Sequence, residues 1–110
     1  MRVAIPLANG KVATHFGHCE RFIFYDTENN LIVNKEAADA PPHQPGLLPE
    51  WLASQGTQVI IAGGMGQRAL QLFARSGIQV VVGAPCCEPE CAIAGYLAGT
   101  LDAGDNICDH

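Results

Sequence analysis

Three of the five cysteines in this 110-residue chain lie within six residues, between Cys86 and Cys91. Such density suits metal ligation or redox chemistry, although a buried cysteine also serves as a small apolar side chain, and at least one of the three is expected to do so. The order Cys86-Cys87-x-x-x-Cys91 matches neither the paired spacing of zinc ribbons nor the common ferredoxin runs. Pro89 suits the first position of a helix, so Cys87 and Cys91 should flank a helix N-terminus, which favours thiolates.

A second chemical cluster is the stretch His15-Phe-Gly-His18-Cys19, which holds two imidazoles and a thiol within five residues. Gly17 allows a tight turn, so His15 and Cys19 could point the same way. Imidazole and thiolate together suit zinc, iron, copper and iron–sulfur chemistry. An equally good interpretation is a histidine that is hydrogen-bonded in a turn, with Cys19 packed beneath it.

A glycine loop, Gly63-Gly64-Met65-Gly66, stands between an expected strand and an expected helix. Its backbone amides could bind an anion. It lacks the lysine and the serine or threonine of a P-loop, and it is not a dinucleotide-binding fingerprint. A tight turn that lets the strand and the helix pack together is an equally good interpretation.

The apolar patterning predicts one α/β domain over residues 1–110, with a five-stranded mixed sheet in the order β-β-β-α-β-α-β-α and flanking helices. Prolines exclude regular structure between residues 40 and 46. The expected strands cover residues 3–7, 21–26, 31–35, 58–62 and 78–82, and the expected helices cover 47–55, 67–76 and 90–101.

This topology predicts where a ligand would bind. If the first three strands form a meander and the rest follow right-handed crossovers, the loops 8–20, 36–46, 63–66 and 83–89 share one edge of the sheet. Ligands of open α/β sheets bind outside the carboxyl ends of the strands. The residues in or just beyond these loops that could ligate a metal are His15, His18, Cys19, His43, Cys86, Cys87 and Cys91. Cys108 and His110 lie in a tail that the pattern does not place.

Composition excludes other classes. The net charge is −5 and the six Lys and Arg residues are scattered, which argues against nucleic-acid binding. No apolar run has the length of a membrane span, and no secretory signal precedes the first expected strand. We therefore expect a cytoplasmic protein with reduced thiols, which fits the odd number of cysteines.

Several motifs resemble the dinitrogenase iron–molybdenum cofactor biosynthesis family, in particular its small stand-alone members related to the molybdenum–copper orange protein. The motifs are His15-Phe-Gly-His-Cys19 with Phe22 and Tyr25-Asp26, Gly63-Gly-Met-Gly66 with Ala69, Gly77-Ile-x-Val-Val-Val-Gly83, Pro41-Pro-His-Gln-Pro-Gly46, and Asn106-Ile-Cys-Asp-His110. The resemblance implies a ribonuclease H-like fold without nuclease activity, and a carrier that binds a metal–sulfur cluster without turning it over. It also implies that His15 is a cofactor ligand and that the glycine loop is part of the pocket. The cysteine-rich loop departs from the family pattern, and extra thiolates would suit iron or another thiophilic metal.

We therefore expect a non-catalytic carrier of a metal–sulfide cluster, iron–sulfur or containing molybdenum or copper. Its partners would be proteins that donate or accept the cluster, and a homodimer is compatible with the sequence. The expected metal ligands are His15, Cys19, Cys86, Cys87, Cys91, Cys108 and His110, and the expected cofactor contacts are Gly63, Gly64, Met65, Gly66, His18 and His43. The alternatives are a thiol redox switch or cysteine-based enzyme that uses Cys19 or the Cys86-Cys87 pair, and a simple zinc- or copper-binding module.

Overall fold

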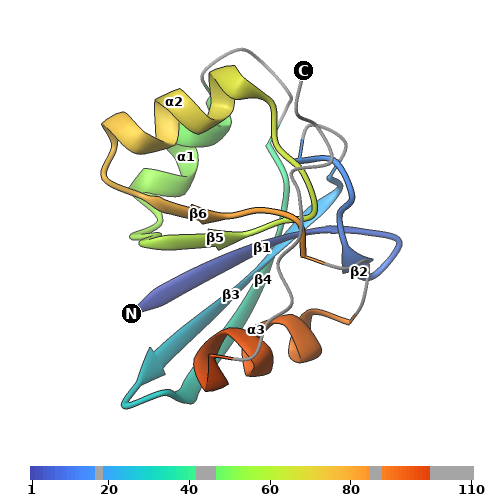
Figure 1. Ribbon diagram of the computed structural model, residues 1–110, viewed down its shortest axis with the longest axis vertical. Coiled ribbons are helices and arrows are strands. Elements are labelled where there is room, and N and C mark those ends of the chain that lie inside the picture. The colour runs from blue at the N-terminus through green and yellow to red at the C-terminus, as the bar shows by residue number, and fades with distance from the viewer. Residues whose placement is uncertain (17–18, 42–46, 85–87, 100–110) are drawn as a thin grey trace.

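The computed structural model describes residues 1–16, 19–41, 47–84 and 88–99, which fold around one mixed sheet (Figure 1). The strands are β1 (Arg2–Ala8), β2 (Lys11–Val12), β3 (Arg21–Glu28), β4 (Leu31–Asp39), β5 (Val59–Ile61) and β6 (Gln79–Val81). The helices are α1 (Leu47–Ser54), α2 (Gln67–Arg75) and α3 (Pro89–Ala98).

The strand order is β4-β3-β1-β5-β6, with β2 paired to β1. The pairs β1–β3 and β3–β4 are antiparallel, whereas β1–β5 and β5–β6 are parallel. Strands β1, β4, β5 and β6 therefore run in the same direction, which confirms the predicted mixed α/β sheet. Their carboxyl ends lie at one edge, where the predicted ligand loops begin.

Helices cover both faces of the sheet, α1 and α2 on one side and α3 on the other (Figure 1). Each face of the sheet has its own hydrophobic core, because successive side chains of a strand point to opposite faces. Phe22 and Phe24 of β3 lie in the cluster that includes Leu52 of α1 and Phe73 of α2. The intervening Ile23 lies in the second cluster, which includes Ala92 and Ile93 of α3.

Two tight turns follow from residues that tolerate positive φ. Asn9 and Gly10, between β1 and β2, have φ of 55° and 77°, and Asn29 and Asn30, between β3 and β4, have φ of 52° and 62°. Such two-residue connections match the right-handed twist of the strands they join. The second turn confirms the predicted hairpin of β3 and β4.

Two details differ from the expected elements. Lys11–Val12 forms a sixth, two-residue strand because the Asn9-Gly10 turn folds it back on β1. Strand β4 continues to Asp39, so residues 36–39 belong to a strand and not to the loop expected there. Pairing with β3 explains this, because Asp39 lies opposite Arg21 and the two form an exposed ion pair of 3.1 Å.

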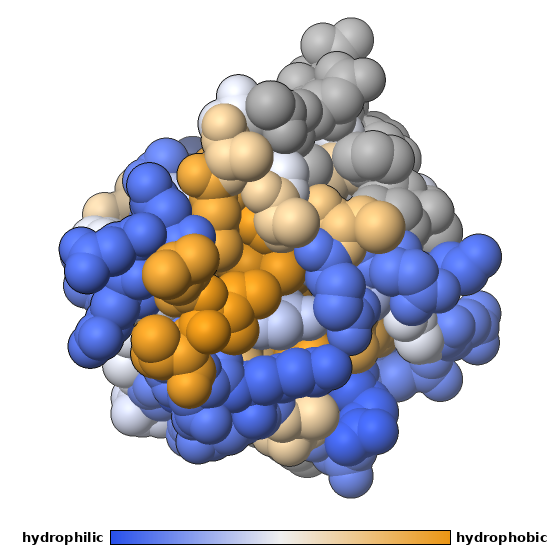
Figure 2. Space-filling view, turned by 90° about the horizontal axis from the view of Figure 1, so that it is seen from below, coloured by the Kyte–Doolittle hydropathy of each residue, from blue (hydrophilic) through white to orange (hydrophobic). Residues whose placement is uncertain are grey.

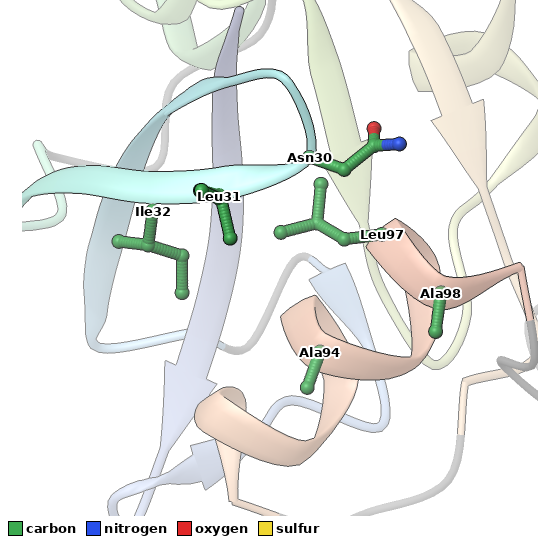
Figure 3. Close-up of a pocket in the computed structure, with 6 residues that line it drawn as sticks. All are labelled: Asn30, Leu31, Ile32, Ala94, Leu97 and Ala98. Carbon is green, nitrogen blue, oxygen red and sulfur yellow. The ribbon is translucent and has the colours of Figure 1, made fainter.

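The face of the molecule that carries α3 exposes apolar surface (Figure 2). Leu31, Ile32 and Val33 at the start of β4 are 68%, 45% and 58% exposed. Beside them a groove of about 450 Å³ is lined by Asn30, Leu31, Ile32, Ala94, Leu97 and Ala98 (Figure 3). Among the described residues, its lining contains no histidine, cysteine or carboxylate, which are the side chains that hold a transition metal.

Among the described residues no helix is both long enough and apolar enough to cross a membrane, and the longest, α3, has 10 residues.

Candidate functional site

The loops at the carboxyl edge of the sheet are joined to one another by backbone hydrogen bonds. The segment after β1 contacts the segment after β5, where Gly63 N–H donates to the Ala13 carbonyl at 3.1 Å and Phe16 N–H donates to the Gly64 carbonyl at 2.9 Å. The segment after β6 joins them, because Gly83 N–H donates to the Gly63 carbonyl at 2.8 Å. The predicted convergence of these loops is thus observed wherever the structure describes them (Figure 1).

The fourth loop of the predicted edge, which follows β4, joins the group through Ala40, whose N–H donates to the Glu20 carbonyl at 3.0 Å. Glu20 also holds the β1–β2 turn, since its carboxylate accepts from Asn9 N–H at 2.9 Å. A hollow of about 260 Å³ opens here, lined by Leu7, Asn9, Gly10, Glu20 and Arg21. Its carboxylate and guanidinium both have partners, since Glu20 binds the turn and Arg21 pairs with Asp39.

His15 lies in the middle of this edge and is half-buried. Its neighbour Phe16 is 5% exposed and makes edge-on ring contacts with Phe22 and Phe73 at centroid distances of 5.9 and 5.5 Å. The loop is therefore fixed by the Phe16 ring in the core and by two hydrogen bonds to the glycine loop. Of the expected metal ligands, His15 is the one that the described backbone places at the convergence of the loops.

Cys19 lies beneath this loop, in the core. Its side chain is 3% exposed, and its N–H donates to the Phe16 carbonyl at 3.3 Å. Burial raises the pKa of the Cys19 thiol to about 11, so the thiol is protonated at neutral pH in this conformation. The arrangement agrees with the sequence interpretation in which Cys19 packs under a turn. Ligation by its sulfur would require the loop to open.

The glycine loop divides into residues with different surroundings. Met65 is fully buried in the core cluster with Phe16 and Phe73, so its side chain contributes to packing. Gly63 N–H is already bonded to Ala13 and cannot donate to a ligand in this conformation. Gly66 is exposed and serves as the N-cap of α2 with an extended backbone.

Gly63 is packed so closely that a side chain would not fit. A Cβ there would lie 2.9 Å from the Ala13 carbonyl oxygen and 3.0 Å from the Cα of Thr14. Both are backbone atoms, which cannot rotate away. Local sequence patterns do not predict this contact, because it joins residues that are fifty positions apart. The paired glycines after a strand are the one local signal of a close approach.

Cys91 lies in the first turn of α3 and is exposed. Pro89 is the first helical residue, as predicted, and the Cys91 N–H donates to the Glu88 carbonyl at 3.0 Å. Cys91 is thus an accessible thiol in a position suited to ligation.

Six of the expected site residues lie outside the described residues: His18, His43, Cys86, Cys87, Cys108 and His110. Within the described part of the chain, no group of three or more histidine, cysteine and acidic side chains is placed to hold a metal ion. A metal-binding function therefore has to combine His15 or Cys91 with residues of the undescribed segments, and the assignments of all these ligands stay predictions.

Comparison with known proteins agrees with this architecture. Residues 1–99 match the family described as dinitrogenase iron-molybdenum cofactor. An uncharacterized protein of Methanocaldococcus jannaschii, MJ0580, is 33% identical over 107 residues, covering 93% of this chain and 90% of its own. The crystal structure of PH0822 superimposes with a TM-score of 0.90 and 31% identity over 97% of both chains.

The apo form of the orange protein from Desulfovibrio gigas has the same fold, with a TM-score of 0.75 and 23% identity over 96% of this chain and 93% of its own. The fold shared with these structures is an α/β sheet whose loops converge beside a glycine loop. The chain belongs to the dinitrogenase iron-molybdenum cofactor family, as the motifs around His15 and Gly63 predicted.

Proposed function

We propose that this protein is a non-catalytic carrier of a metal–sulfide cluster, which it holds at the carboxyl edge of the sheet for assembly, storage or delivery. The observation that carries the proposal is the convergence of the loops after β1, β5 and β6, with His15 on one side and the start of the cysteine loop on the other. Membership of a family named for the iron–molybdenum cofactor supports a metallocluster as the cargo.

The ligands proposed for the cluster are the thiolates of Cys86, Cys87 and Cys91 together with the His15 imidazole. Thiolate and imidazole bind iron, copper and zinc, and bridging sulfide completes iron–sulfur and mixed clusters. Cys91 supports this set because it is exposed at a helix N-terminus. Cluster donor and acceptor proteins would be the partners, since a carrier exchanges its cargo.

The buried Cys19 weighs against the thiol-enzyme alternative at that residue. A nucleophilic cysteine needs a lowered pKa and access to its substrate. Burial has the opposite effect on Cys19, since it raises the pKa to about 11. A redox role for Cys86 and Cys87 is a separate hypothesis. Metal retention and the alkylation rate of these two cysteines distinguish it from cluster binding.

The test is anaerobic reconstitution with ferrous iron and sulfide, followed by desalting and measurement of bound iron, acid-labile sulfide and visible absorbance. The native protein should retain both elements in constant ratio. Cys86→Ser, Cys87→Ser and His15→Ala should each lose most of the loading. Glu28→Gln is a matched control, because Glu28 is exposed at the opposite end of the sheet and should leave loading unchanged.

Unchanged iron and sulfide in both cysteine variants would contradict the proposed site. Metal retained without sulfide would favour a simple zinc- or copper-binding module. No retention of metal, together with rapid alkylation of Cys86 or Cys87 below pH 8, would favour the thiol redox alternative.

A further inference from the structure

We infer that Gly63 is the positioning residue of the site: its missing side chain lets the His15 loop lie against it, and its backbone carbonyl holds Gly83, at the start of the cysteine loop, on the other side. The consequence for cluster loading rests on the proposed function, whereas the consequence for the His15 loop does not.

Gly63 lies between the two loops in the strand order. It follows β5, the strand between β1 and β6. On the β1 side its N–H donates to the Ala13 carbonyl at 3.1 Å, two residues before His15. On the β6 side its carbonyl accepts from Gly83 N–H at 2.8 Å, three residues before Cys86. Gly63 therefore contacts both the segment that leads to His15 and the segment that follows β6.

The requirement for glycine at this position is steric. Gly63 is not among the glycines with positive φ, so alanine could adopt its backbone conformation. The obstacle is the neighbouring chain, because an added Cβ would lie 2.9 Å from the Ala13 oxygen and 3.1 Å from the Thr14 oxygen. These contacts are with backbone atoms, so the whole segment has to move to relieve them.

A displacement of the segment that contains Ala13 and Thr14 would also displace His15. The far end of its loop is fixed, since Phe16 is buried against Phe22 and Phe73 and its N–H binds the Gly64 carbonyl. A displacement forced at Ala13 and Thr14 is therefore taken up between Thr14 and Phe16. Sites that bind metals lose affinity when a supporting group shifts a ligand out of place.

The test compares Gly63→Ala with Gly66→Ala. Both changes add one methyl group to the same loop, but a Cβ on Gly66 meets no atom within 4 Å and the Gly66 backbone has φ of −68°. Two quantities are measured in each variant: the NMR signals of the His15 ring and of the Phe16 amide in the metal-free protein, and iron and sulfide retained after reconstitution.

In Gly63→Ala we expect shifted His15 and Phe16 signals, faster exchange of the Phe16 amide, and about a tenfold loss of cluster loading. Gly66→Ala should match the native protein in its His15 and Phe16 signals, because its added methyl group meets no neighbouring atom. Gly66 is itself an expected cofactor contact, so it is not the control for cluster loading. A third variant, Ile93→Val, lies in the core on the α3 side and controls for loss of stability alone. It should leave the His15 signals and the loading unchanged.

Native His15 signals in a folded Gly63→Ala protein would overturn the inference, whatever the cluster result. Shifted signals with unchanged loading would overturn the role of Gly63 in the site and leave the proposed function standing. If the native protein takes up no cluster, the proposed function fails, and the NMR comparison still decides whether Gly63 positions the loop.

Gly63→Ala could also prevent folding. In that case the test is the hydrogen-exchange rate of the Gly63, Phe16 and Gly83 amides in the native protein. We expect these three amides to exchange with deuterium as slowly as the strand amides, because all three donate hydrogen bonds in the described contacts. Exchange at the rate of an unstructured chain would overturn it.

Discussion

Cys19 and Cys91 differ in surroundings although both occur in motifs that predict metal ligation. Cys19 packs in the core between the His15 loop and β3, and Cys91 is exposed on α3. Reaction of a thiol with an alkylating reagent requires the thiolate and access to the sulfur. These two cysteines should therefore report the arrangement of the metal-free protein.

We predict that iodoacetamide at pH 8 modifies Cys91 in the folded, metal-free protein and leaves Cys19 unmodified over the same time. Burial and a pKa raised to about 11 both slow the reaction of Cys19. Mass spectrometry of the peptides after a time course measures each site separately, and unfolding in urea should make both react. Equal rates in the folded protein would show that Cys19 is accessible.

The same pKa predicts a pH dependence of stability. The Cys19 pKa rises from 9.0 to about 11 on folding, so the folded state binds the proton more tightly. This contribution is fully present below pH 9 and is lost as the pH rises from about 9 to about 11, with a total of roughly 3 kcal/mol.

Urea unfolding at pH 8 and pH 10.5 measures this contribution, with Cys19→Ala as the comparison. The native protein should lose more stability over this interval than the variant, because the variant has no thiol to titrate. The Tyr25 pKa, raised by burial to about 12, acts in the same direction in both proteins and cancels in the difference. Parallel losses in the two proteins would contradict the assigned burial of Cys19.

At the scale of elements, Arg2 connects three strands. Its guanidinium lies 2.9 Å from Asp26 of β3 and 3.0 Å from Glu36 of β4, and it stacks over the Phe24 ring at 4.6 Å. The pKa of Asp26 lies below its usual 3.8: burial acts to raise it, and hydrogen bonds from Asn34 and Arg2 lower it by more. The Arg2 cluster thus stabilises the amino edge of the sheet, away from the candidate site.

We predict that Arg2→Met lowers the free energy of unfolding at pH 7 by about 2 kcal/mol, since it leaves a half-buried carboxylate without its partner. Arg21→Met is the matched control: its ion pair with Asp39 is exposed, and it should cost less than about 0.5 kcal/mol. Chemical denaturation of both variants measures the two values.

The difference between Arg2→Met and the native protein should also shrink below pH 4. The depressed Asp26 pKa contributes stability that is present above the unfolded value of 3.8 and is lost as the pH falls through the folded value. An undiminished difference at pH 2.5 would mean that Arg2 stabilises through packing on Phe24 alone.

The order and type of the main elements could be predicted from local patterns. The signals act within a few residues of the chain: the apolar run of β1, the aromatic and β-branched run of β3, the glycines after the helices, and Pro89 at the start of α3. The length of β4 could not be predicted, because its residues 31–37 are exposed and are held as a strand by pairing with β3. The strand β2 was not predicted, because its two residues are too few to show the alternating pattern of a strand.

The position of the candidate site could be predicted, but its internal arrangement could not. Strand directions alone place His15, Gly63 and the segment after β6 at one edge. Whether a cysteine in such a motif faces a ligand or the core depends on three-dimensional packing, and Cys19 proved to be buried. The close approach of Gly63 to Ala13 likewise depends on a contact between distant residues.

At the scale of the whole molecule, and among the described residues, the apolar groove is separate from the loops that hold His15 and the glycine loop. The groove between β4 and α3 is lined by asparagine, leucine, isoleucine and alanine side chains (Figure 3). His15 and the glycine loop lie at the carboxyl edge of the sheet. This separation predicts that changes in the groove leave metal content unaffected.

The central claim, that this protein carries a metal–sulfide cluster, is tested most directly by its native contents. The protein would be purified without oxygen, and its visible spectrum, acid-labile sulfide and iron, molybdenum, copper and zinc would be measured. We predict charge-transfer absorbance with metal and sulfide in fixed proportion to protein, the elements naming the cluster. A colourless protein that contains no sulfide and takes up none with iron on reconstitution would contradict the claim.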